Sequence, residues 1–158
     1  MKSSVYVETS VISYLAARGS RVAQVAARQE STHAWWAIAR QRFQLYASGP
    51  VIDEASQGDP KYAQKRLQYL QGLPVLDGSS AAEELAAILI GDDAVPSKAA
   101  DDAAHIAIAV TNGMAYLVTW NCRHIANAQR RKRIEAVCRR SGYEPTILCT
   151  PEELMGDE

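Results

Sequence analysis

Short apolar runs alternate along the chain with longer segments of helical periodicity. Residues 5–7 are β-branched and aromatic, and the runs 116–120 and 146–149 are similar in composition, so each is predicted to be a strand. A shorter strand is expected at residues 72–76. Apolar residues at three- and four-residue spacing predict the intervening helices. These cover residues 11–17, 22–47 with a break near 31–32, 51–56, 61–71, 81–90, 99–110 and 127–140.

Two of these helices have distinctive burial patterns. The segment 99–110 is almost entirely apolar except for Asp101, Asp102 and His105, which predicts a central buried helix. The segment 22–47 carries a mostly apolar stripe at helical spacing, which is typical of core packing. The stripe consists of Trp35, Ile38, Ala39, Arg42, Phe43 and Tyr46.

The alternation of strands and helices predicts the fold class. Strands separated by helices pair in parallel, which gives a three-layer α/β/α fold with a central, mainly parallel sheet. The sequence contains no linker, repeat or low-complexity tract, so residues 1–158 are expected to form a single domain. In such folds, ligands bind beyond the carboxyl ends of the strands.

Composition and charge exclude several classes. The length of 158 residues suits one domain, and a net charge of −1 provides no general attraction to nucleic acid. The three cysteines, Cys122, Cys138 and Cys149, form no close metal-type pair. A disulfide framework or zinc site is therefore not expected, and a reduced cytoplasm is the simplest setting. Neither a signal peptide nor a membrane span is predicted.

Four oxygen-bearing side chains occupy positions where one site can gather them. Glu8 and Asn121 each close a strand-like run, Asp102 opens the buried helix, and Glu54 lies in a short helix. Carboxylates at strand ends and helix starts favour a site for a hard cation. The chain has no glycine-rich phosphate loop and no nucleophile elbow, so metal-assisted chemistry is the leading enzymatic interpretation.

Each candidate also has a structural explanation. Glu8 and Asp102 precede or open helices, where an acid interacts favourably with free amides and the helix dipole. Glu54 fits a solvated helix acid, and Asn121 fits a turn residue at a strand end. His105 shares a helix face with Asp102, so it is either a hydrogen-bonded core residue or a partner that orients Asp102.

A basic stretch follows Asn121. It carries seven cations, Arg123, Arg130, Arg131, Lys132, Arg133, Arg139 and Arg140, against the single acid Glu135. Arg131 and Glu135 are spaced to pair along the helix. The stretch is either a solvated helix face or, because it starts beside a candidate site residue, a contact surface for nucleic acid.

Four segments together resemble the PIN-domain family, especially toxins of the VapC type. Val5–Ile12 looks like the opening hydrophobic-Asp-Thr-Ser segment of that family, and Val51–Glu54 looks like the segment with its second acid. Ala100–Ala107 looks like its Asp-Ala-x-His/Leu-x-Ala helix, and Leu117–Asn121 looks like its late strand ending in Thr-x-Asp. The segments occur in the family's order and span nearly the whole chain.

The resemblance implies a PIN-like fold and RNA cleavage with one or two Mg²⁺ or Mn²⁺ ions. It also implies a cognate antitoxin protein and frequent homodimers. This chain departs from the family pattern twice, because Glu8 replaces the first Asp and Asn121 replaces the last. Three carboxylates remain, Glu8, Glu54 and Asp102, which is enough for one hard cation.

The leading hypothesis is a metal-dependent endoribonuclease whose catalytic residues are Glu8, Glu54, Asp102 and Asn121. The first three are the expected metal ligands. Supporting roles near the metal or its water are expected for Thr9, Ser10, Asp101, His105 and Thr119. The RNA backbone would contact Arg123, Arg130, Lys132 and Arg133.

Two other hypotheses remain open. In the first, a PIN-like domain with weakened catalysis acts by binding RNA or regulating a partner, which the changes at positions 8 and 121 motivate. In the second, the domain is purely structural or partner-binding, its acids are helix caps and its basic helix is solvated. Binding of Mn²⁺ and of RNA separates the three.

Overall fold

The computed structural model describes residues 1–156 and contains one five-stranded sheet. The strands are β1 (Ser4–Val7), β2 (Gln44–Ser48), β3 (Val75–Leu76), β4 (Tyr116–Val118) and β5 (Ile147–Cys149). They lie in the order β3-β2-β1-β4-β5, and every pair of neighbours is parallel. The prediction of an α/β fold with a mainly parallel sheet is confirmed.

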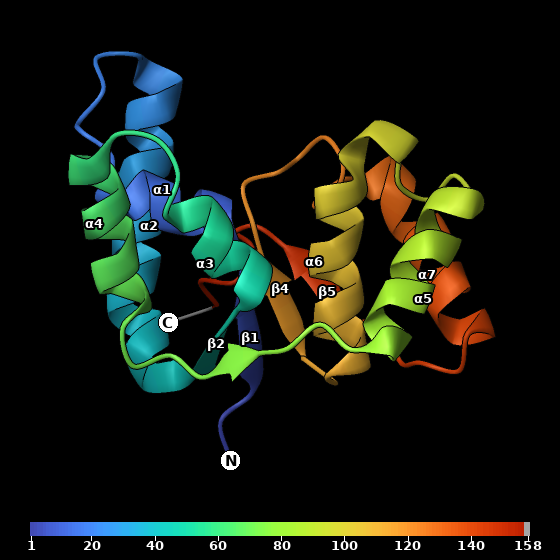
Figure 1. Cartoon of the computed structure of the whole chain (residues 1–158). Coiled ribbons are helices and arrows are strands. Elements are labelled where there is room, and N and C mark those ends of the chain that lie inside the picture. The colour runs from blue at the N-terminus through green and yellow to red at the C-terminus, as the bar shows by residue number, and fades with distance from the viewer. Residues whose placement is uncertain (157–158) are drawn as a thin grey trace.

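Helices lie on both sides of this sheet (Figure 1). One group comprises α1 (Thr9–Ala16), α2 (Ala23–Arg42) and α4 (Pro60–Leu70), and the other α5 (Ser80–Gly91), α6 (Ala100–Thr111) and α7 (Ala128–Arg140). The short α3 (Gly49–Ala55) directly follows β2, and a 3₁₀ turn, η1 (Ser97–Ala99), precedes α6. None of the described helices is long and apolar enough to cross a membrane.

The core joins the sheet to the buried faces of the helices. The central strand β1 contributes Val5, Tyr6 and Val7, which are fully buried. Every residue of α6 from His105 to Val110 is buried, whereas Asp101 is exposed at its start. Helix 99–110 is therefore the central buried helix that its composition predicts.

The predicted helix 22–47 is wrong in two respects. Helix α2 continues through Ser31 and Thr32, and the Thr32 hydroxyl donates to the Arg28 carbonyl within the helix, at 2.5 Å. The helix then ends at Arg42, and residues 44–48 form strand β2. Leu45 and Ala47 face the core there with the two-residue alternation of a strand, whereas the spacing of Phe43 and Tyr46 imitates a helix.

The three cysteines are free, as expected. Cys138 and Cys149 are buried, and burial raises the pKa of their thiols to about 11 and about 12. Both thiols are therefore protonated at neutral pH. Cys122 is exposed in the turn after β4.

We expect the contact between α5 and α6 to be a major source of stability, and neighbouring residues of α5 test this. Leu89 is fully buried and Ile88 is 42% exposed. Leu89→Ala should lower the free energy of unfolding by about 2–5 kcal/mol, because it leaves a cavity. Ile88→Ala should change it by about 0.5 kcal/mol, since it removes exposed surface. Urea denaturation measures both, and equal effects would contradict this packing.

Candidate functional site

The candidate site lies at the carboxyl ends of β1 and β4. Within the sheet, β2 and β3 lie on one side of β1, whereas β4 and β5 lie on its other side. The strand order therefore reverses between β1 and β4, and open parallel sheets bind ligands at such a point. Glu8 directly follows β1 and Thr119 directly follows β4, and the Glu8 amide donates to the Val118 carbonyl at 3.1 Å.

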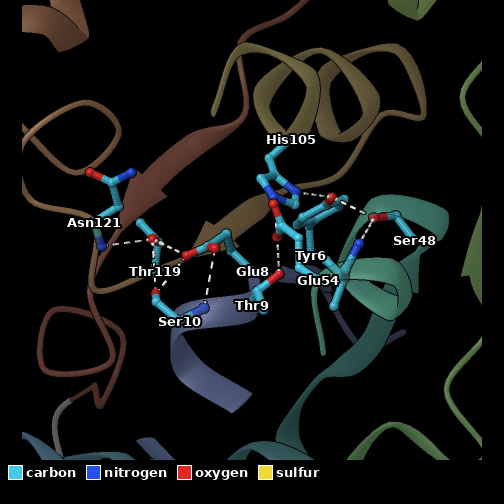
Figure 2. Close-up of polar contacts among 10 residues, drawn as sticks. Tyr6, Glu8, Thr9, Ser10, Ser48, Glu54, His105, Thr119 and Asn121 are labelled. Carbon is cyan, nitrogen blue, oxygen red and sulfur yellow. Dashed lines mark hydrogen bonds and ion pairs between the residues drawn. The ribbon is translucent and has the colours of Figure 1, made fainter. Parts of the chain in front are cut away.

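Glu8 is 7% exposed, and its carboxylate accepts hydrogen bonds from three donors. Oε1 accepts from the hydroxyls of Ser10 and Thr119, each at 2.5 Å, and Oε2 accepts from the Ser10 amide at 3.1 Å (Figure 2). The last bond makes Glu8 the N-cap of α1. The structural and the functional explanation of Glu8 are therefore compatible, because a carboxylate offers about four acceptor positions and three are used.

Glu54 reaches the same region from the end of α3. Its Oε1 accepts hydrogen bonds from the Thr9 hydroxyl and from Nε2 of His105, the latter at 2.9 Å. No described residue donates to its Oε2. This carboxylate is therefore held by one oxygen, and its other oxygen is available to a ligand.

His105 is connected to the interior by a chain of hydrogen bonds (Figure 2). Its Nδ1 lies 2.6 Å from the Tyr6 hydroxyl, which lies 2.6 Å from the Ser48 hydroxyl. Ser48 accepts in turn from the Val51 amide at 3.2 Å. Tyr6, Ser48 and His105 are all buried, so the orientation of the imidazole is fixed from inside the core.

The pKa values of the His105–Glu54 pair favour an ion pair. Burial opposes ionisation of Glu54, but the hydrogen bond and charge of His105 and the Thr9 hydroxyl outweigh it, and the pKa of Glu54 is lowered. Burial likewise opposes protonation of His105, but its bond to Glu54 and the charges of Glu8, Glu54 and Asp102 raise its pKa. Burial raises the pKa of Tyr6, so its hydroxyl keeps its proton.

The third predicted ligand, Asp102, pairs with a residue that sequence reasoning missed. Its Oδ2 lies 2.8 Å from Nδ1 of His124. The Asn121 side chain accepts from the His124 amide at 3.0 Å, and its carbonyl accepts from the amides of Ile125 and Ala126. Asn121 thus shapes the turn that carries His124. The signal for His124 was weak, because a single histidine in a polar turn marks no particular chemistry.

Two carboxylates approach closely enough to hold one cation, and His105 lies beside them. Ligand atoms of Glu8, Glu54 and His105 all lie within 4.8 Å of one another. Asp102 is not in this close group, although its charge acts on His105. Carboxylate oxygens suit Mg²⁺ or Mn²⁺, and an imidazole suits later transition metals. Free acceptor positions on Glu8 and Glu54 fit a divalent cation, which would be a Lewis acid beside the sheet.

The supporting residues also have defined contacts. The hydroxyls of Thr9, Ser10 and Thr119 donate to the two glutamates, which makes them partners of the carboxylates. Backbone amides hold two of these hydroxyls, because Trp120 donates to Ser10 at 2.8 Å and Asn121 to Thr119 at 2.9 Å. Asp101 is exposed and makes no side-chain bond to a described residue.

Most cations of the basic stretch are already engaged. Arg130 and Arg133 donate to the carbonyls of Ala94 and Asp93, at 3.2 and 3.3 Å. The predicted pairing of Arg131 with Glu135 is wrong, because loop packing brings Glu153 to Arg131 at 3.1 Å and Glu135 contacts Arg139 at 3.7 Å. Arg140 pairs with Asp92. Arg123 and Lys132 are exposed, with no side-chain partner among the described residues.

The architecture is a PIN-like fold, and it matches solved structures of VapC toxins. The VapBC2 structure from Rickettsia felis, bound to a DNA fragment from its promoter, superposes with a TM-score of 0.58 at 15% identity, over 92% of this chain and 96% of the other. The sarcin-ricin loop cleaving toxin VapC20 of Mycobacterium tuberculosis gives 0.57 and 18%, over 76% and 92%. No protein-family model matches the sequence, and no curated protein matches it.

The buried hydrogen-bond chain can be tested with Tyr6→Phe. The change keeps the ring but leaves His105 and Ser48 without their shared partner, so the free energy of unfolding should fall by about 1–3 kcal/mol. Tyr116→Phe is the matched control, because that hydroxyl bonds to no described residue, and it should change stability by about 0.5 kcal/mol. Indistinguishable denaturation curves for the two variants would contradict a structural role for the chain.

The His105–Glu54 ion pair predicts a pH window of extra stability. Because the pKa of His105 is raised, its ion pair contributes its full stability below pH 6.5, the ordinary pKa of histidine, and this contribution is lost as pH rises through the raised pKa. Because the pKa of Glu54 is lowered, its contribution is full above pH 4.5 and is lost as pH falls through the lowered pKa. The advantage of wild type over His105→Gln should therefore be greatest between these values. Thermal melts across the pH range measure it, and a constant difference would refute the pairing.

Proposed function

We propose that this protein is a metal-dependent endoribonuclease and the toxin of a type II toxin–antitoxin pair. The observation that carries the proposal is the approach of Glu8, Glu54 and His105 within 4.8 Å of one another beyond the carboxyl ends of β1 and β4, with Asp102 on the same helix as His105. The fold supports it as well, because the similar structures are VapC toxins. Ordinary helix capping explains Glu8 alone, but it does not explain the approach of Glu54 from a different helix.

The chemistry would centre on the two glutamates. Glu8 and Glu54 would hold Mg²⁺ or Mn²⁺, and Asp102 would be the third carboxylate of the site. When bound, the cation would supply Lewis-acid chemistry at a phosphodiester. Ser10 and Thr119 fix the Glu8 carboxylate by donating to it, and His105 and Thr9 do the same for Glu54. These donors would keep both carboxylates in ligand geometry before the cation arrives.

The partner in the proposal is a cognate antitoxin. The VapBC2 complex supports an antitoxin partner, since nearly the whole of this chain superposes on that structure. We also propose that the protein acts on RNA and is able to form a homodimer, as the resemblance to VapC toxins implies. Its three free cysteines favour the reduced cytoplasm as the setting.

One observation favours a second candidate function. Asp102 is engaged by His124 and lies outside the close group of Glu8, Glu54 and His105. If Asp102 stays with His124, a cation has two carboxylates instead of three. The protein would then be a weakened PIN-like domain that binds RNA or regulates a partner.

Cleavage assays with single-stranded RNA test the proposal. Cleavage should require Mg²⁺ or Mn²⁺, stop in EDTA, and be abolished by Asp102→Asn and Glu54→Gln, because each change removes a ligand charge. Asp53→Asn is the matched control, because Asp53 is exposed beside Glu54, and it should keep full activity. Thermal melts would confirm that all three variants fold.

Two outcomes would contradict the nuclease. Cleavage that persists in EDTA or in Asp102→Asn would show that the metal site is not responsible. Binding of RNA with no cleavage and no Mn²⁺ binding by calorimetry would favour the second candidate function.

A further inference from the structure

We propose that a cavity beside the metal site, between α1 and α4, is a subsite for one nucleotide of single-stranded RNA. The ligand assignment rests on the proposed nuclease function. The cavity has a volume of about 670 Å³, and residues of α1, the α3–α4 turn and α4 line it. That volume lies within the range of pockets that hold small organic ligands, about 300–1,000 Å³.

Residues that closely follow the site residues in sequence line the cavity. Ser13 lines it from α1, one helical turn after Thr9 and Ser10, which bind the two glutamates. Gln57 lines it from the other side, and its amide donates to the Glu54 carbonyl at 3.2 Å. A strand of RNA whose phosphate lay at the metal site could therefore place a neighbouring nucleotide here.

Tyr62 gives the cavity an aromatic surface. It is partly exposed in the first turns of α4. The Nζ atoms of Lys61 and Lys65, which do not line the cavity, lie over this ring at 5.7 and 5.3 Å from its centroid. Aromatic side chains with adjacent cations are the usual platform for unpaired bases, because every base can stack on the ring and the cations attract its phosphate.

The two arginines in the cavity have different roles: one holds the α3–α4 turn, and the other is available to a phosphate. Arg66 donates from Nε to the Ala55 carbonyl at 2.9 Å and from Nη2 to the Gln57 carbonyl, so it holds the α3–α4 turn in place. Arg18 is exposed, with no side-chain bond to a described residue, and is free to meet a phosphate. The one acid in the lining, Asp59, accepts from the Lys61 amide at 2.9 Å as the cap of α4.

The cavity offers RNA more available contact groups than α7 does. On α7, Arg130 and Arg133 donate to backbone carbonyls, and Arg131, Arg139 and Arg140 contact acids. No aromatic ring of α7 accompanies them, because the helix contains none. The cavity combines a ring and an exposed arginine, and two lysines outside its lining contact the same ring.

Fluorescence anisotropy in EDTA measures binding without cleavage. The probe is a short labelled single-stranded RNA, and the proteins are wild type, Tyr62→Ala, Tyr62→Phe, Arg18→Ala and Lys2→Ala. Tyr62→Ala should weaken binding about tenfold, and Tyr62→Phe should remain within about twofold because the ring is kept. Arg18→Ala should weaken binding and reduce the salt slope by about one, whereas Lys2→Ala, an exposed cation before β1 at the amino end of the sheet, should do neither.

A second probe separates stacking from a structural effect. An RNA with a fluorescent purine analogue should lose emission when it binds wild type and Tyr62→Phe, but not Tyr62→Ala. Unchanged affinity of Tyr62→Ala, absence of RNA binding by wild type, or equal weakening by Lys2→Ala would overturn the subsite. Metal-dependent cleavage with unchanged binding by Tyr62→Ala would leave the nuclease standing, and Tyr62-dependent binding without cleavage would reject only the nuclease.

Discussion

The site depends on compensating the charges of two carboxylates that meet at the edge of one sheet, and of a third, Asp102, outside their close group. Each carboxylate has its own donors: Glu8 accepts from Ser10 and Thr119, Glu54 from Thr9 and His105, and Asp102 contacts His124. Without such donors, carboxylates at the edge of a core would protonate or turn to solvent. Hydroxyls and imidazoles keep them together while leaving some of their lone pairs for a ligand.

The sheet topology explains why these partners come from distant parts of the chain. Glu8 and Thr119 lie at the ends of adjacent strands, 111 positions apart in sequence, and one hydrogen bond joins them. Ser48 ends β2 on the other side of β1, and through Tyr6 it sets the orientation of His105. The site is thus assembled by β1 and its two neighbours, and the hydrogen-bond chain ties it to the core.

Much of the fold followed from local patterns. The β-branched run at Val5–Val7 and the apolar helix after Asp102 have unambiguous periodicity, and both elements form as expected. Strand β2 was missed because Phe43 and Tyr46 continue the spacing of the preceding helix and no Gly or Pro marks its end at Arg42. Its two-residue alternation was too short to compete with that pattern.

The candidate site was less accessible to sequence reasoning than the fold. The acids were visible because charges that interrupt apolar segments need partners. The pairing of Asp102 with His124, and the bond of His105 to Glu54 instead of Asp102, depend on how α3, α6 and the turn after β4 meet in space. No spacing in the sequence encodes that meeting.

A crystal structure of the protein soaked in Mn²⁺ tests most directly whether the compensated carboxylates bind a cation. Our account predicts one anomalous peak bound by oxygens of Glu8 and Glu54, with Asp102 turned from His124 toward it. Saturated crystals with no peak among these residues, and His124 still paired with Asp102, would contradict it.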